Sequence, residues 1–252
     1  VNTTPSTTFS VPSYTTGTTT GSLVLLSLWY QGNDEISVKI TSPNGNSLEK
    51  ATGSPANYTL SWDNLIIMDN ASTGVDANNG DRNCLILITD SYGYLTAGDW
   101  TLTIRGNTIR QGGHYDVWIA SSSIGPSPAK SSYFSSSSGT NKETITIPGT
   151  AERVITVGAF STKTSWVDYA KTTRSLPGVQ LNNLAYFSSV GPTRDDPGQI
   201  AGRQKPDICA SGFGVVAALS QNATSLRSTT YRNEDGVHVM MMGTSMAAPH
   251  VA

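Results

Sequence analysis

The chain has 252 residues, a formal net charge of −2 at neutral pH, and only 13% charged residues. Such sparse and nearly balanced charge does not indicate a positively charged surface of the kind that attracts nucleic acid or an anionic membrane. We therefore expect neither as a partner. The longest strongly apolar run, residues 23–30, is too short to cross a bilayer. The length suffices for one large domain or two modest ones.

The first 120 residues contain short segments in which apolar and polar residues alternate, separated by turn residues such as Pro43-Asn44-Gly45. This pattern is typical of an antiparallel β-sandwich. In one such segment Trp100, Leu102 and Ile104 share a face. Strands are expected at residues 22–30, 35–41, 58–62, 65–68, 84–89, 98–106 and 115–119.

Two features of this region have alternative interpretations. The tryptophans of this region occupy alternating strand positions, so we expect them to pack within the sheets. The alternative is an aromatic surface that binds carbohydrate. These residues are Trp29, Trp62, Trp100 and Trp118. Residues 69–83 are dense in oxygen groups of the kind that Ca²⁺ takes, but their spacing does not match an EF-hand and Asn-Asn-Gly is also turn chemistry. No cofactor is therefore assigned, and calcium remains the alternative to turns; the residues are Asp69, Asn70, Asp76, Asn78, Asn79, Asp81 and Asn83.

Residues 121–139 are rich in serine and include Pro126 and Pro128, the composition of a linker. We therefore expect a sandwich domain at residues 1–120, a Ser-rich linker at 121–143 and a second domain at 144–252. A passive tether is the favoured interpretation of the linker, and a loop bordering a substrate cleft is the alternative. Cys84 and Cys209 fall in different predicted domains, so no disulfide is argued and Cys209 is expected to be a buried free thiol.

Residues 243–252 have the sequence G-T-S-M-A-A-P-H-V-A. A serine hydroxyl needs an adjacent base to act as a nucleophile, and the first N–H groups of a helix are free to stabilise an oxyanion. The segment resembles the nucleophile motif of the subtilisin-like serine proteases (subtilases), G-T-S-M-A-x-P-H-V-A. The resemblance implies that Ser245 is the catalytic nucleophile, that Gly243 and Thr244 support the oxyanion site, and that His250 is structural.

Three further segments resemble the family in the same order: V-I-T-V-G-A at residues 154–159, which resembles a buried strand of the family, A-Y-F-S-S-V-G-P-T at 185–193 and K-P-D-I-C-A-S-G at 205–212. Ser211 stands where the family usually has proline. The resemblance, over residues 144–252, implies the C-terminal part of an α/β subtilisin-like domain with a mostly parallel sheet. The sandwich resembles the jelly-roll modules attached to many subtilases, here inserted before residues 154–159.

Three family motifs are absent from the sequence: the Asp in D-[ST]-G, the His in H-G-T and the oxyanion Asn in A-G-N. Asp90 and His114 occur in the right order before Ser245. However, Tyr92 interrupts the motif after Asp90, and His114 lies in an alternating β pattern. We expect both to be sheet-end residues.

The sequence therefore predicts a serine endopeptidase with an acyl-enzyme on Ser245, whose Asp, His and Asn lie outside this chain, so the fragment alone is expected to be inactive. Met241 and Met242 are expected to line the leaving-group side of the cleft. Expected partners are a protein or peptide substrate and the upstream half of the same catalytic domain, with self-association of the fragment through a bare apolar face. The resemblance implies a secreted or cell-envelope protein. The alternative function is a non-catalytic relative whose β-sandwich is a binding or scaffold module.

Overall fold

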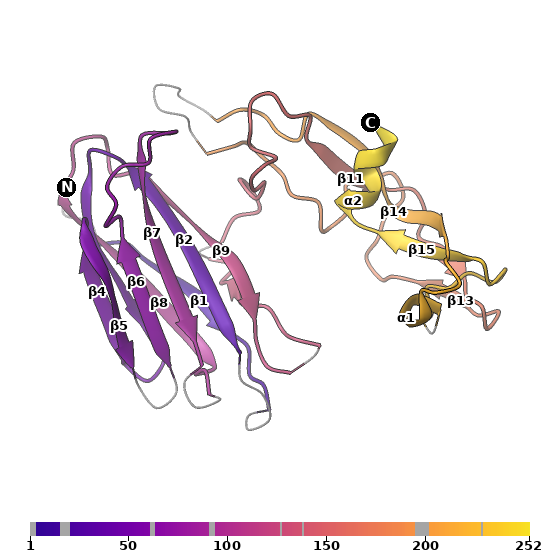
Figure 1. Ribbon diagram of the computed structural model, residues 1–252, viewed down its shortest axis with the longest axis horizontal. Coiled ribbons are helices and arrows are strands. Elements are labelled where there is room, and N and C mark those ends of the chain that lie inside the picture. The colour runs from indigo at the N-terminus through magenta and orange to yellow at the C-terminus, as the bar shows by residue number, and fades with distance from the viewer. Residues whose placement is uncertain are drawn as a thin grey trace. The chain divides into compact units, whose positions relative to one another are not determined.

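The structure, a computed structural model, describes residues 4–15, 21–60, 64–90, 94–126, 128–137, 139–194, 202–227 and 229–252. Strands dominate it, and the chain divides into two compact units, Val1–Thr140 and Asn141–Ala252, each with its own hydrophobic cluster (Figure 1). Among the helices of the described residues, none is both long and apolar enough to cross a membrane.

One sheet of the first unit has the strand order β10-β1-β8-β3-β4, and every neighbouring pair is antiparallel. The predicted turn after Thr41 connects β3 to β4, and the N–H of Ser42 donates to the carbonyl of Asn46 at 2.8 Å. The bounds are β1 Ser6–Val11, β3 Glu35–Thr41, β4 Ser47–Ala51, β8 Gly98–Thr108 and β10 Tyr133–Phe134.

The other sheet of this unit has the order β5-β6-β7-β2-β9 and is also antiparallel throughout. All seven predicted strands are present. The strand predicted at residues 35–41 has the observed bounds, the others have shifted ends, and the predicted end at Trp62 lies outside the described residues. β1, β4 and β10 were not predicted, because β1 and β4 are short and mostly polar and β10 has only two residues. The bounds are β2 Leu23–Gln31, β5 Ser54–Leu60, β6 Leu65–Asn70, β7 Asp81–Thr89 and β9 Tyr115–Ser123.

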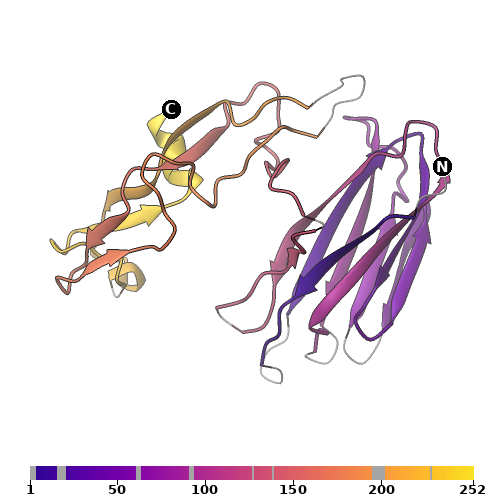
Figure 2. The ribbon, with the colours of Figure 1, turned by 180° about the vertical axis from the view of Figure 1, so that it is seen from behind.

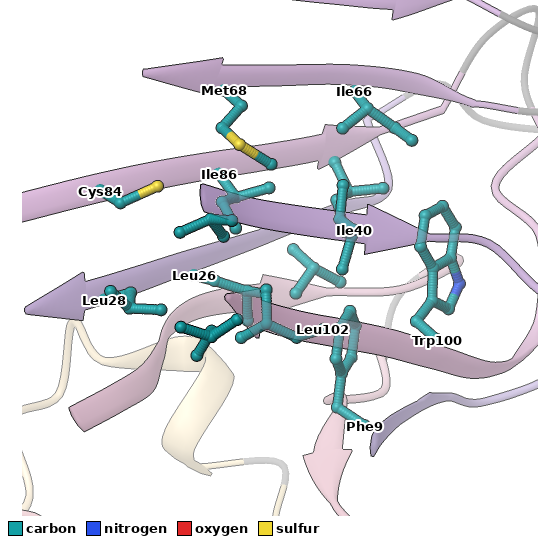
Figure 3. Close-up of a cluster of buried hydrophobic side chains, with 14 of the residues drawn as sticks. Phe9, Leu26, Leu28, Ile40, Ile66, Met68, Cys84, Ile86, Trp100 and Leu102 are labelled. Atoms are coloured by element: carbon teal, nitrogen blue, oxygen red, sulfur yellow. The ribbon is translucent and has the colours of Figure 1, made fainter. Parts of the chain in front are cut away.

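The two sheets share one core (Figure 3). Along β8, Trp100, Leu102 and Ile104 are all buried, which confirms the predicted shared face. Phe9 of β1 stacks beside Trp100, with ring centroids 6.3 Å apart. Trp29 and Trp118 lie half-buried on the outer side of β2 and β9, so the tryptophans described here pack within or against the sheets.

The Ser-rich segment differs from the expected linker at residues 121–143. β9 continues to Ser123, buried Ile124 exchanges two backbone hydrogen bonds with Lys130 (2.8 and 2.9 Å), and β10 pairs with β1. The first unit therefore extends to Thr140 instead of residue 120. The reason is that apolar residues are interspersed among the serines: Ile124 and Phe134 join the core of the first unit.

The second unit centres on a three-stranded sheet of order β11-β14-β15, beside a separate β12–β13 hairpin (Figure 2). β11 runs parallel to β14, whereas β15 runs antiparallel to it, so this sheet is mixed and not the mostly parallel one expected. The described return from β14 to β15 contains only the short α1. The bounds are β11 Val157–Ser161, β12 Ser165–Val167, β13 Thr173–Ser175, β14 Ile208–Ala218, α1 Thr224–Arg227, β15 His238–Met242, α2 Thr244–Ala247 and the 3₁₀ turn η1 Ala248–His250.

Two expectations for the second unit are wrong in detail. The strand expected at residues 154–159 begins only at Val157, and Ile155 is 69% exposed. Cys209 is an exposed thiol, whereas Cys84 is the buried one. β11 is an edge strand of the described sheet, and exposed apolar side chains such as Ile155 and Ile208 lie near it. This exposure matches the predicted bare apolar face.

The oxygen-rich loop at residues 69–83 uses its side chains in local turns. Asp69 accepts hydrogen bonds from the N–H and hydroxyl of Ser72, and Asp76 accepts one from the N–H of Asn78. Buried Asn70 accepts a hydrogen bond from the hydroxyl of Tyr30. Over the residues that the structure describes, no three His, Cys, Asp or Glu side chains gather as a metal site. Local turns therefore account for the printed hydrogen bonds of Asp69 and Asp76.

Candidate active site

The site begins at the turn between β15 and α2. Gly243 has φ 146°, a backbone conformation that side chains other than glycine rarely adopt. Its N–H donates to the carbonyl of Gly212 on β14 at 2.8 Å, and its carbonyl accepts from the N–H of Met246 at 3.0 Å. A single glycine therefore turns the chain from a strand into a helix.

Small residues allow this turn to sit tightly on the sheet. A Cβ atom on Gly212 would lie 2.4 Å from the Cβ of Ala159 and 2.9 Å from the carbonyl oxygen of Gly243. Ala247 of α2 is completely buried, in a cluster that includes Ala159 and Phe213. The backbone of β14 thus approaches both β11 and the start of α2 at distances that only glycine allows.

Ser245 lies exposed in the first turn of α2. Within the described part of the chain, neither its hydroxyl nor its backbone N–H has a hydrogen-bond partner, as is usual for the first N–H groups of a helix. Thr244 is also exposed. Met241 and Met242 are half-buried opposite Val215 and Phe213 of β14, and Met242 packs against the small cluster beneath α2.

Within the described residues, no histidine is hydrogen-bonded to Ser245, and each of the three has another partner. His250 has its Nδ1 2.7 Å from the carbonyl oxygen of Met246, which fits the structural role expected for it. His238 has its Nδ1 2.6 Å from Asp235 Oδ2, and His114 has its Nε2 3.2 Å from Asp116 Oδ2.

Asp90 and His114 do not form a pair. Asp90 follows β7 at the end that pairs with Leu23, whereas His114 precedes β9 at the end that pairs with Tyr30. These two positions on β2 are roughly 24 Å apart at about 3.4 Å per residue. Asp90 instead accepts the N–H of Gly21 at 2.9 Å. Both residues are sheet-end residues, as predicted.

The motif segments of the second unit interlock around β11. The hydroxyl of Ser188 accepts the N–H of Ala159 at 3.0 Å, and the N–H of Ala185 donates to the carbonyl of Ala159 at 2.9 Å. These bonds tie residues 185–193 to the strand beside α2. Ala159 in turn packs in one cluster with Ala247 of α2, so the loop at residues 185–193 helps to hold α2 against the sheet.

A buried lysine holds the start of the same strand. Lys205 Nζ donates to the carbonyl of Val154 and to Asp207 Oδ2, both at 2.7 Å, and Asp207 also accepts the N–H of Thr156 at 2.7 Å. The Lys205 ammonium and then the Thr156 N–H lower the pKa of Asp207 below its ordinary value. The sequence motif at residues 205–212 did not indicate that Lys205 and Asp207 form hydrogen bonds to the backbone of residues 154–156.

Comparison with known proteins adds independent findings. The sequence model of the Subtilase family matches residues 16–252. An uncharacterised protein of Aquifex aeolicus is 40% identical over 105 residues, covering 41% of this chain and 40% of that protein. The serine protease AprX of Bacillus subtilis is 35% identical over 112 residues, covering 44% of this chain and 22% of AprX.

Among solved structures, the CspB protease of Clostridium perfringens has a similar fold. The TM-score is 0.65 at 19% sequence identity, and the match covers 98% of this chain and 42% of the CspB chain. The match to the CspB protease therefore extends over both units of this chain. The chain spans less than half the length of each of these relatives.

Proposed function

Since the chain belongs to the subtilase family, we propose that the intact protein is a serine endopeptidase whose nucleophile is Ser245. The observation that carries the proposal is the exposed Ser245 in the first turn of α2, seated by the hydrogen bond from Gly243 to Gly212. A nucleophile needs such a fixed and accessible position, because a serine hydroxyl reacts only when substrate and base reach it in one geometry.

In the proposed reaction, Ser245 Oγ attacks the scissile carbonyl carbon while a histidine takes its proton. The tetrahedral intermediate then expels the amine, which receives that proton, and water hydrolyses the acyl-enzyme. The N–H of Ser245 is one oxyanion donor, supported by Gly243 and Thr244. The histidine, the aspartate and the oxyanion asparagine come from sequence outside this chain, since the family's D-[ST]-G, H-G-T and A-G-N motifs are absent from it.

The remaining assignments follow from the family. The first unit is proposed to be a jelly-roll-like insert, and the second to be the C-terminal part of the catalytic α/β domain. Met241 and Met242 line the leaving-group side of the cleft, and substrates are proteins or peptides. The protein acts outside the cell or in the cell envelope.

The test uses the full-length protein with its upstream segment. A fluorophosphonate probe should label the wild-type protein and not Ser245→Ala, and peptide hydrolysis should fall by several orders of magnitude, since triad members act as a unit. Thr244→Val should cost only about 1–3 kcal/mol in transition-state stabilisation. Ser47→Ala, on the exposed β4, is the matched control. Unchanged hydrolysis in Ser245→Ala would instead favour a non-catalytic scaffold with a binding sandwich.

A further inference from the structure

The two outer faces of the sandwich differ in composition. In the sheet β10-β1-β8-β3-β4, the side chains that point away from the core are polar. One row across three of its strands consists of Thr103, Lys39 and Glu49, none of them buried. Such a face is expected of an antiparallel sheet that contacts water on one side.

The outer face of the other sheet is apolar instead. Leu25 of β2 lies opposite Leu87 of β7, and Leu87 lies opposite Ile67 of β6. Ile67 in turn lies opposite Tyr58 of β5, which is 64% exposed. The exposed or half-buried apolar residues on this side of the sheet form what we call the outer apolar face: Leu23, Leu25, Trp29, Tyr58, Leu65, Ile67, Leu85, Leu87 and Trp118.

The central strands of this sheet are apolar on both sides. Residues 23–29 of β2 have the sequence L-V-L-L-S-L-W, and residues 84–88 of β7 have the sequence C-L-I-L-I. Near-continuous apolar runs are typical of strands whose sheet is covered on both faces. A contiguous apolar patch on the surface of a protein marks an interaction site. The outer apolar face is therefore expected to have a covering layer.

The polar groups on this face have partners of their own. Asn83 Nδ2 donates to the hydroxyl of Ser27 at 3.1 Å, and these two residues lie among the apolar side chains. Asp69 accepts the hydroxyl of Ser72 at 2.8 Å. The covering layer therefore needs an apolar surface and few hydrogen-bonding groups, which is the character of a permanent interface more than of a transient one.

The size of the face restricts the kind of partner. Five strands spaced about 4.8 Å apart, over seven residues of about 3.4 Å each, make a face of roughly 600 Å². Counted on both partners, a covering layer buries about 1,200 Å², which lies within the range of roughly 600–1,500 Å² for domains of one chain. Stable complexes between separate proteins bury about 1,600 Å². The area thus favours a covalently connected partner over a second copy.

We infer that the outer apolar face packs against the part of the catalytic domain that lies upstream of this chain. This occupant rests on the proposed function, in which the first unit is an insert and the Asp, His and Asn motifs precede it. An insert is joined to its host, so the host is present near the face at high local concentration. The chain covers 42% of the CspB chain, so that relative contains further sequence that could supply such a partner.

The test compares the 252-residue chain with the full-length protein, both carrying Ser245→Ala to prevent self-digestion. Hydroxyl-radical footprinting, read by mass spectrometry, measures how fast each side chain is oxidised. Tyr58 and Tyr133 are matched probes, because they are 64% and 59% exposed and belong to different sheets of the sandwich. In the full-length protein Tyr58 should react several-fold more slowly, as should Trp29, whereas Tyr133 should react as before.

Two outcomes of the footprint overturn the inference. Equal reactivity of Tyr58 in the two proteins would show that the upstream part does not cover the face. Protection of Tyr58 in the 252-residue chain that grows with its concentration would assign the face to a second copy. The readout involves no catalysis, so the hydrolysis test of Ser245 and the footprint of Tyr58 succeed or fail independently.

A charge placed in the face provides a second test. Leu85 is 44% exposed, so in the 252-residue chain Leu85→Lys should leave urea unfolding nearly unchanged, because the ammonium reaches water. In the full-length protein it should raise the reactivity of Tyr58 several-fold, since covering an ammonium removes its hydration. Thr101→Lys, on the polar outer face, is the control and should leave Tyr58 protected. Unchanged protection in Leu85→Lys, or a large loss of stability in the 252-residue chain, contradicts the inference.

Discussion

The N–H of Gly243 donates to the carbonyl of Gly212 at 2.8 Å, and this bond joins the turn before α2 to the middle of β14. The two glycines act together, because the missing side chain of Gly212 makes room for Gly243 while the φ of 146° at Gly243 starts the helix. The exposed position of Ser245 depends on this contact between two backbones.

Replacing Gly212 with alanine should therefore weaken the packing of α2 against β14. The added Cβ would lie 2.4 Å from Ala159, and overpacking of this kind costs about 1–3 kcal/mol. Hydrogen exchange of peptides from β14, β15 and α2, followed by mass spectrometry, should show faster exchange in Gly212→Ala. Ala218→Ser, at the exposed end of β14, is the control and should exchange as the wild type does. Identical exchange in both variants would contradict the close packing.

The chain as given should not hydrolyse peptides. No histidine is hydrogen-bonded to Ser245 among the described residues, and the family's D-[ST]-G and H-G-T motifs are absent from the sequence, so we expect no base for Ser245 within this chain. Incubation with a generic peptide substrate and a fluorophosphonate probe should show neither turnover nor labelling. Labelling that disappears in Ser245→Ala would reveal that a base within these 252 residues serves the serine.

The carboxylate of Asp168 should titrate at unusually low pH. It is buried and accepts the N–H of Thr172 at 2.9 Å and the guanidinium of Arg174 at 2.7 Å. The Thr172 N–H first, and then Arg174, lower its pKa. A lowered folded-state pKa means that this group stabilises the fold above the ordinary aspartate pKa of about 3.9, and that the stabilisation is lost as the pH falls through the lower folded-state value.

The Thr172 amide resonance measures this titration directly. Followed from neutral to acidic pH, it should change with a midpoint below the ordinary aspartate value. Arg174→Met should move the midpoint upward without restoring the ordinary value, because the Thr172 N–H remains. A midpoint at the ordinary value in the wild-type chain would show that these hydrogen bonds do not stabilise the ionised carboxylate.

The exposed apolar side chains beside β11 should drive self-association. Ile155 is 69% exposed and Ile208 is 48% exposed, and exposed apolar surface next to an edge strand promotes pairing between molecules. The double variant Ile155→Ser, Ile208→Ser should lower the apparent mass in light scattering and reduce dye binding. Val75→Ser, exposed in the first unit, is the control. A wild-type chain that is already monomeric at high concentration would refute this expectation.

Tyr30→Phe should destabilise the first unit. The hydroxyl donates to Asn70 Oδ1 at 2.9 Å and lies 3.0 Å from the Thr52 hydroxyl, and burial raises the pKa of Tyr30 to about 12. Its removal leaves a buried acceptor unpaired, which costs about 1–3 kcal/mol. Urea unfolding monitored by tryptophan fluorescence should show the loss, whereas Tyr58→Phe, at a 64% exposed position, should not. Equal stability of the two variants would contradict the role of the hydrogen bond.

Local sequence determined much of this protein. Alternating apolar residues fixed the strands of the first unit, because side chains in a strand point alternately to its two faces: Trp100 and Leu102 are buried as their spacing predicts. The run at residues 243–252 likewise identified the nucleophile candidate, because it resembles the subtilase nucleophile motif at every specified position. Those inferences needed only neighbouring residues.

Tertiary structure decided what depends on distant partners. Composition suggested a linker at residues 121–143, but Phe134 packs against Phe9, a contact between the last and the first strand of this unit. The thiol of Cys209 is exposed because burial of a strand residue depends on the layer that covers it, and not on its own strand. The outer apolar face arises in the same way: its residues come from five strands and form one surface only after those strands have paired.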